Sequence, residues 1–239
     1  MYALILLAIA LAPGVAIGVY IYLKDHHERE PIGLLLRAFF FGILSVMVTL
    51  LISGVIDQFI TIDPSSLSEQ ALHAFIIVAL VEEFSKFIFV RGILYRSNHF
   101  NEPFDGIVYS VMVSMGFATL ENVLYAFNGG MGTAIMRMFT AVPAHATFAV
   151  LMGFYLGKAK FEHKKSYYAF HALGVATLFH GAYDYFLFIS WIPGLVLGAI
   201  ASLIIGIWLS KKAIRIHQLA SPFKNQTPDS TQPINTENT

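Results

Sequence analysis

Long apolar stretches alternate with short polar segments along this chain of 239 residues. A helix needs about 20 apolar residues to cross a bilayer, and seven stretches of the chain reach that length. The expected spans are residues 2–23, 32–55, 71–91, 104–128, 135–157, 168–189 and 191–210. The pattern therefore predicts an all-α fold, a polytopic transmembrane helical bundle of about seven spans.

The composition agrees with a chain whose main partner is the lipid bilayer. Hydrophobic residues make up 56% of the chain and charged residues only 13%, whereas soluble domains average about 25% charged residues. The formal net charge is zero, so no nucleic-acid partner is expected. The chain has no cysteine, which excludes disulfides, thiolate catalysis and cysteine-based metal sites.

Basic residues occupy alternate loops, and this predicts the orientation of the chain in the membrane. The loops 56–70 and 129–134 and the segment around residue 190 contain no Lys or Arg, although Arg137 lies at the edge of one of them. Basic residues follow the first, third, fifth and seventh spans: Lys24, Arg29, Arg91, Arg96, Lys158, Lys160, Lys164, Lys165, Lys211, Lys212 and Arg215. Since basic loops stay in the cytoplasm, we expect the N-terminus outside and the C-terminus inside.

The distribution of apolar and polar residues predicts two parts of the chain, a membrane domain and a tail. Residues 1–212 form one membrane-embedded domain. Residues 213–239 form a cytoplasmic tail, rich in Pro, Thr and Asn towards its end. Such a composition buries too little apolar surface to fold, so disorder is expected there.

Two adjacent glutamates, Glu82 and Glu83, interrupt the third apolar stretch near its centre. A carboxylate at that depth costs about 2.5–3.5 kcal/mol on insertion scales. Lys86 follows Glu82 by four residues and Glu83 by three, so all three side chains share one helix face. Lys86 can neutralise one glutamate and leave the other free to hold or release a proton. The alternative is a buried ion pair that only holds helices together.

Three further predicted spans each place ionisable or polar side chains at membrane depth. They are Glu121 and Asn122, with Phe117 one turn earlier, then His145, then His180 and Asp184. Pro143 lies just before His145 and is expected to kink that helix. Because intramembrane ionisable groups face the bundle interior or a wet cavity, we expect these residues to converge on one buried polar site. A purely structural polar network is the alternative.

Such a site has the groups that hydrolysis of a peptide bond requires. One route uses carboxylates and histidines alone: one glutamate accepts a proton from water, the other donates one, and histidines stabilise the oxyanion. The other route uses a zinc ion held by Glu121, His145 and His180, with Glu82 or Glu83 as the general base. The chain contains no HExxH motif, so both routes stay open.

The motifs EExxK (Glu82, Glu83, Lys86), FATLEN ending at Asn122, PAHATF around His145 and HGAYD ending at Asp184 resemble the PrsW intramembrane protease family. The resemblance covers roughly residues 1–212 and lies within the wider superfamily of prenyl proteases. Glu82 matches the first glutamate of the paired motif and His180 the later histidine. Glu121 and Asp184 stand where the prenyl protease branch has His and Asn, which puts the glutamate-only route in doubt.

The resemblance implies an activity, a substrate and a location. The protein would make the first, extracytoplasmic (site-1) cut in a single-span anti-sigma factor, within the bacterial cell membrane. That cut would lead to release of a sigma-W type sigma factor during envelope stress. Two other classes compete with this one: a proton-coupled transporter that uses the same buried cluster, and a membrane receptor without chemistry. The chain shows no internal repeat of the kind many transporters have.

Overall fold

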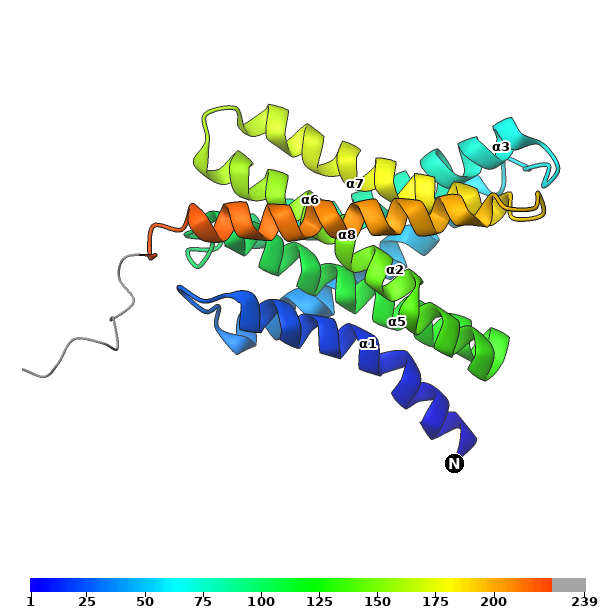
Figure 1. Ribbon diagram of the computed structural model, residues 1–239, viewed down its shortest axis with the longest axis horizontal. Helices are drawn as coiled ribbons and strands as arrows, with labels where there is room; N and C mark the ends of the chain where they lie inside the picture. Colours follow the sequence, from blue (N-terminus) through cyan, green and yellow to red (C-terminus); the bar gives the residue numbers. More distant parts are fainter. Residues whose placement is uncertain (225–239) are drawn as a thin grey trace, which may run out of the picture.

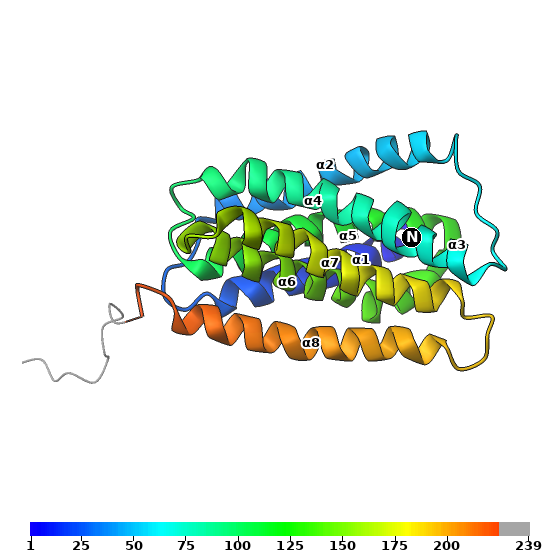
Figure 2. The same ribbon diagram turned by 90° about the horizontal axis from the view of Figure 1, so that it is seen from above.

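The computed structural model describes residues 1–224, and these fold into helices without any strand. The elements are α1 (Tyr2–Lys24), α2 (Ile32–Ile56), α3 (Leu67–Leu72), the π-helical segment η1 (His73–Leu80), α4 (Val81–Gly92), the 3₁₀ turn η2 (Leu94–Arg96), α5 (Pro103–Phe139), α6 (Ala141–Phe161), α7 (Lys165–Phe188) and α8 (Val196–Leu219). The all-α prediction is confirmed for this part of the chain. Figures 1 and 2 show the long helices side by side in one bundle.

Four helical segments are long and apolar enough to cross a membrane: α1, α2, Pro103–Phe161 and α8. The third contains both α5 and α6, so the four include five of the seven predicted spans. The predicted spans 71–91 and 168–189 are not among them, and the first of these carries four charged side chains. The protein is thus a helical membrane protein, while the count of seven stays a prediction.

Helix α5 is the centre of the bundle (Figure 2). Sixteen consecutive residues, 104–119, are buried, as expected of a helix that is apolar on all sides. Glycines let its neighbours approach: a Cβ on Gly116 would collide with the backbone of Phe39 in α2, and one on Gly106 with the backbone of Gly153 in α6. The buried position of α5 lets one helix present residues to several others.

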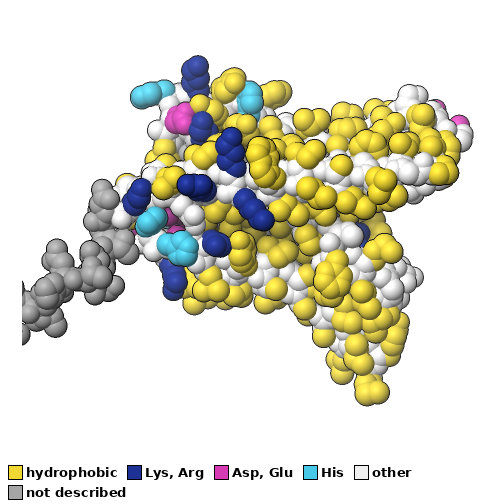
Figure 3. Space-filling view, viewed as in Figure 1, with side chains coloured by type: hydrophobic (Ala, Val, Ile, Leu, Met, Phe, Trp, Pro, Cys, Tyr) yellow, Lys and Arg dark blue, Asp and Glu magenta, His cyan; other side chains and the backbone are white. Residues whose placement is uncertain are grey.

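Basic side chains gather at one end of the molecule, the end at which α8 finishes (Figure 3). The last turns of α1, α4 and α6 contribute Lys24, Arg91, Lys158 and Lys160. We call this the basic end. Its existence agrees with the alternation of basic loops, but the direction of the termini across a membrane stays a prediction.

The boundary between the fourth and fifth predicted spans lies at Gly130, inside the predicted loop 129–134, although the loop is reduced to a sharp turn. Two helices meet at this residue, whose φ of +76° suits a residue without a Cβ, and the second of them ends at Phe139. Pro143 is the third residue of α6 rather than a kink within it. Proline is tolerated in the first turn, where backbone N–H groups have no intrahelical acceptor.

Two other boundaries also differ from the predicted ones. The third span begins earlier, at Leu67, and its residues His73–Leu80 are π-helical. π-Helical turns inside α-helices are frequent at functional sites, and this one ends two residues before Glu82. The last helix runs from Val196 to Leu219, so residues 213–219 are helical and not part of a disordered tail. Residues 225–239 of the predicted tail lie outside the described residues.

Candidate active site

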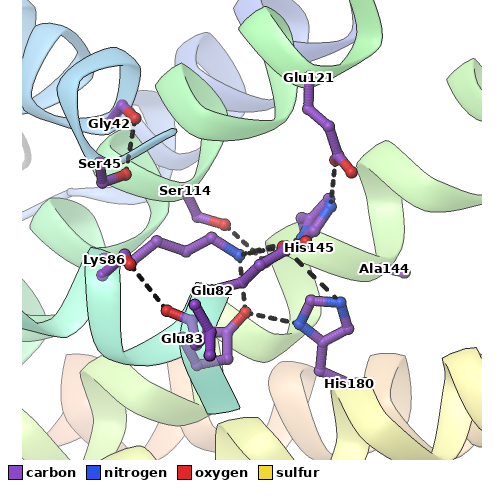
Figure 4. A network of polar contacts seen from close by, with 12 residues as sticks. Gly42, Ser45, Glu82, Glu83, Lys86, Ser114, Glu121, Ala144, His145 and His180 are labelled. Carbon is purple, nitrogen blue, oxygen red and sulfur yellow. Dashed lines mark hydrogen bonds and ion pairs between the residues drawn. The ribbon is translucent and has the colours of Figure 1, made fainter. Parts of the chain in front are cut away.

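The paired glutamates of α4 are buried together with Lys86. The ammonium Nζ of Lys86 lies 2.7 Å from Oε1 of Glu83 and 3.4 Å from Oε2 of Glu82. It also lies 4.0 Å from the ring centroid of Phe117, a cation–π contact. The predicted shared face is confirmed, and Lys86 pairs more closely with the second glutamate than with the first (Figure 4).

His180 of α7 joins both glutamates of α4. Its Nδ1 lies 2.9 Å from Oε1 of Glu83, and because an ionised carboxylate can only accept, Nδ1 is the donor. Its Nε2 faces the other way, 3.2 Å from Oδ2 of Asp184 and 3.9 Å from Oε2 of Glu82. The ring stacks on Phe148 with centroids 4.9 Å apart. Glu83 therefore fixes the orientation of this histidine.

His145 of α6 is held in the same manner by a carboxylate from α5. Its Nε2 lies 2.9 Å from Oε2 of Glu121, and its Nδ1 lies 3.3 Å from Nζ of Lys86. Since an ammonium only donates, Nδ1 accepts and Nε2–H donates to Glu121. The hydroxyl of Ser114 donates to the backbone carbonyl of His145 at 3.0 Å. The His145 and His180 rings are 5.1 Å apart and nearly perpendicular.

A cavity of about 400 Å³ opens beside these residues. Its lining includes Glu82, Glu121, His145, His180 and Asp184, but neither Glu83 nor Lys86. The two adjacent glutamates thus differ in position: Glu82 faces the cavity, whereas Glu83 lies behind it, between the lysine and a histidine. Five of the six predicted catalytic residues line this space, and the sixth, Glu83, contacts one of them, His180.

Arg137 is a member of the site that was not predicted. It lines the cavity, and its guanidinium lies 2.8 Å from Oε2 of Glu121. It reaches this position because the chain turns at Gly130, so that the following helical residues bring Arg137 back to Glu121. A signal was present in the sequence, since Arg137 is an isolated cation at the edge of a segment that otherwise lacks Lys and Arg.

The predicted supporting residues Asn122 and Phe117 lie at different distances from the two histidines. Phe117 contacts the His145 ring and Lys86 directly. Asn122 accepts a hydrogen bond from Nε of Arg137 at 3.2 Å and donates to the carbonyl of Ala10 at 3.0 Å. It therefore holds Arg137 and ties α5 to α1 without contacting the histidines. His73 also lines the cavity.

One group around the cavity has the ligand chemistry of a metal site. Glu82, His145 and His180 each present one donor atom, and these atoms all lie within 4.8 Å of one another. The expected set contained Glu121 in place of Glu82. Glu121 instead binds Nε2–H of His145, as Glu83 binds Nδ1–H of His180. Histidine ligands of metals commonly donate their other N–H to a carboxylate, so the residues present fit a metal ion.

Membrane-spanning helices around a buried cavity of carboxylates and imidazoles fit the class of intramembrane hydrolases. The family described as PrsW family intramembrane metalloprotease matches residues 30–210. Similar proteins include Protease PrsW of Geobacillus kaustophilus, 45% identical over 76% of this chain and 79% of that protein. Protease PrsW of Bacillus subtilis is 38% identical over 78% and 84%, respectively. No solved structure matches the chain.

The chain belongs to the PrsW family of intramembrane proteases, and it is a peptidase. The competing readings as a transporter or as a receptor without chemistry are thereby set aside. The family description also names metal-dependent chemistry, in agreement with the donor group around the cavity.

Proposed function

We propose that this protein is an intramembrane endopeptidase of the bacterial cell membrane that makes the first, extracytoplasmic cut in a single-span anti-sigma factor. That cut would lead to release of a sigma-W type sigma factor in envelope stress. The position of the cavity supports the side of cleavage. It is lined by Leu187 and Phe188 at the end of α7 and by His73 at the start of η1. These residues lie away from the basic end, which is cytoplasmic by the positive-inside rule.

The metal in this proposal is zinc, held by Glu82, His145 and His180. Two histidines and one glutamate are an established ligand set of catalytic zinc sites, with a further position left open. When bound, the ion would activate a water molecule and polarise the scissile carbonyl. Nε2 of His180 and Nδ1 of His145 would be the ligand atoms, because the other ring nitrogens donate to Glu83 and Glu121. The Nδ1 lone pair of His145 accepts from Lys86 in this structure, so the ion would displace that ammonium.

The remaining charged residues of the cavity have separate roles in the proposal. Asp184 lines the cavity outside the ligand group, and its ion pair is with Nε2 of His180. It accepts the proton from the attacking water and passes it to the leaving amine. Arg137 can donate N–H groups towards the developing oxyanion while it holds Glu121. Lys86 compensates the charge of Glu83.

The observation that carries the proposal is the convergence of Glu82, His145 and His180 on one cavity. The test combines metal analysis of the purified protein with cleavage of a co-expressed single-span anti-sigma factor. Glu82→Gln should lose both the bound zinc and the cleavage, whereas Asp184→Asn should keep the zinc and lose at least about 100-fold in cleavage rate. His163→Ala, an exposed histidine in the α6–α7 loop, is the matched control and should change neither.

Three results would each refute a part of the proposal. If the wild-type protein contains no stoichiometric metal and its cleavage activity resists chelators, the zinc mechanism is rejected and the glutamate-only route is favoured. Undiminished cleavage in both Glu82→Gln and Asp184→Asn would remove these residues from the chemistry. If the metal-loaded protein cuts no anti-sigma factor, the proposed metal site stands but the proposed substrate is rejected.

A further inference from the structure

A second group of buried carboxylates lies near the basic end of the bundle. Asp25 directly follows α1, Glu102 precedes α5, and Asp105 is in the first turn of α5. One carboxylate oxygen of each lies within 4.8 Å of the others. All three are at most 1% exposed. This carboxylate cluster contains no residue of the active site described above.

Hydrogen bonds account for part of the cluster. Glu102 and Asp105 form a capping box, in which each side chain accepts from the backbone N–H of the other. Oδ2 of Asp105 also accepts from the backbone of Asn101 at 2.8 Å, and the hydroxyl of Ser221 donates to Glu102. The start of α5 thus explains these carboxylates as helix caps, but it does not explain Asp25.

Asp25 is a buried carboxylate without a close hydrogen-bond donor. Neither of its oxygens has a hydrogen-bond partner, and Oδ1 of Asp105 has none either. Among the described residues, no ion pair joins Asp25, Glu102 or Asp105 to a Lys, Arg or His. Buried charges are ordinarily paired or coordinate metals. Burial raises the pKa of Asp25 to about 7, with the nearby charge of Glu102 as a further cause.

We propose that Asp25, Glu102 and Asp105 bind one hard divalent cation of the Mg²⁺ or Ca²⁺ kind. The donor set consists only of oxygens, which these ions prefer, and lacks the imidazoles of the zinc ligand group. Two oxygens bound to one Ca²⁺ ion at 2.3–2.6 Å lie at most about 5 Å apart. The spacing of the three carboxylates is within that limit. The unpaired oxygens of Asp25 and Asp105 are the atoms that the ion would satisfy.

The site would fasten together parts of the chain that are distant in sequence. It joins the end of α1 to the start of α5, the helix that carries Glu121. Ser221, which follows α8, donates to Glu102, and Gln218 of α8 donates to the carbonyl of Lys24 at 2.6 Å. A cation here would therefore stabilise the packing of α1, α5 and α8 without taking part in peptide hydrolysis.

The experiment measures thermal unfolding of the full-length protein in detergent after removal of metals with EDTA. All proteins carry His145→Ala, which removes a ligand of the proposed zinc site. Added MgCl₂ or CaCl₂ should raise the unfolding temperature in a saturable manner, by about 5–10 °C at about 100 times Kd. The two salts are separate arms that identify the preferred ion. Asp25→Asn should abolish the rise, and Glu28→Gln, an exposed carboxylate three residues away, should leave it unchanged.

Equilibrium dialysis supplies a readout that does not depend on stability. The His145→Ala protein should bind one Mg²⁺ or Ca²⁺ ion per chain, and Asp25→Asn or Glu102→Gln in that background should bind none. The use of two variants keeps the test decisive if one of them fails to fold. The proposal is overturned if neither ion binds with saturation. It is equally overturned if stability rises only on acidification, since shared protons then fill the cluster.

Discussion

Removal of the ammonium group of Lys86 should expose the energetic role of the Glu83–Lys86 ion pair. The two side chains are 1% and 2% exposed, and their charged atoms are 2.7 Å apart. At that separation an effective dielectric constant of 20 gives an attraction of about 6 kcal/mol. Desolvation offsets part of this, and the loss of one partner of a buried pair ordinarily costs about 3–5 kcal/mol. Lys86→Met should therefore destabilise the protein by about 3–5 kcal/mol.

The double variant Glu83→Gln, Lys86→Met is the informative comparison. It removes both charges of the pair, while the amide oxygen of Gln can still accept from Nδ1 of His180. Glu82 would lose its contact with Lys86 as well, but it lines the cavity, where water can solvate it. We expect the double variant to regain most of the lost stability and to come within about 2 kcal/mol of the wild type.

The assay is unfolding in mixed micelles with increasing SDS, run on the wild type, both single variants and the double variant. The four free energies form a double-mutant cycle that isolates the pair. If the two single losses simply add in the double variant, Lys86 and Glu83 are not coupled. Lys86 would then serve some purpose other than the compensation of buried charge, and the reasoning from this geometry would fail.

Two further outcomes follow from the site and the fold. Arg137→Gln should lower the cleavage rate about 10–100-fold with zinc content unchanged, because Arg137 holds Glu121 and no proposed ligand; an unchanged rate would exclude it from catalysis. Gly116→Ala should destabilise the bundle by about 1–3 kcal/mol or more, because its Cβ would collide with the backbone of Phe39. Gly33→Ala, with open space around its Cβ, should be neutral or stabilising, and equal effects of the two would contradict the close approach of α2 and α5.

The hydrophobic pattern was sufficient to predict the helices. A segment that crosses a bilayer must be long enough to span it and must form all its backbone hydrogen bonds internally, which a helix does. It also pointed to the charged residues that line the cavity, apart from Arg137. Burial of the charges of Glu82, Glu83 and Glu121 in apolar segments costs so much free energy that each carboxylate was expected to have a polar or charged partner. The break at 129–134 was predictable as well and lies at Gly130, whereas the start of the third span and the end of the last helix were not.

Tertiary structure decided which of these residues does what. Adjacent glutamates point in different directions on a helix, so only the packing of α5, α6 and α7 against α4 could place Glu82 at the cavity and Glu83 behind it. The same packing moved Glu121 from expected ligand to partner of His145 and brought in Arg137. The sequence by itself determined that costly polar groups must meet inside the bundle. Their roles depend on distances of a few ångströms between side chains on different helices. The spacing of residues along one helix gives no information about those distances.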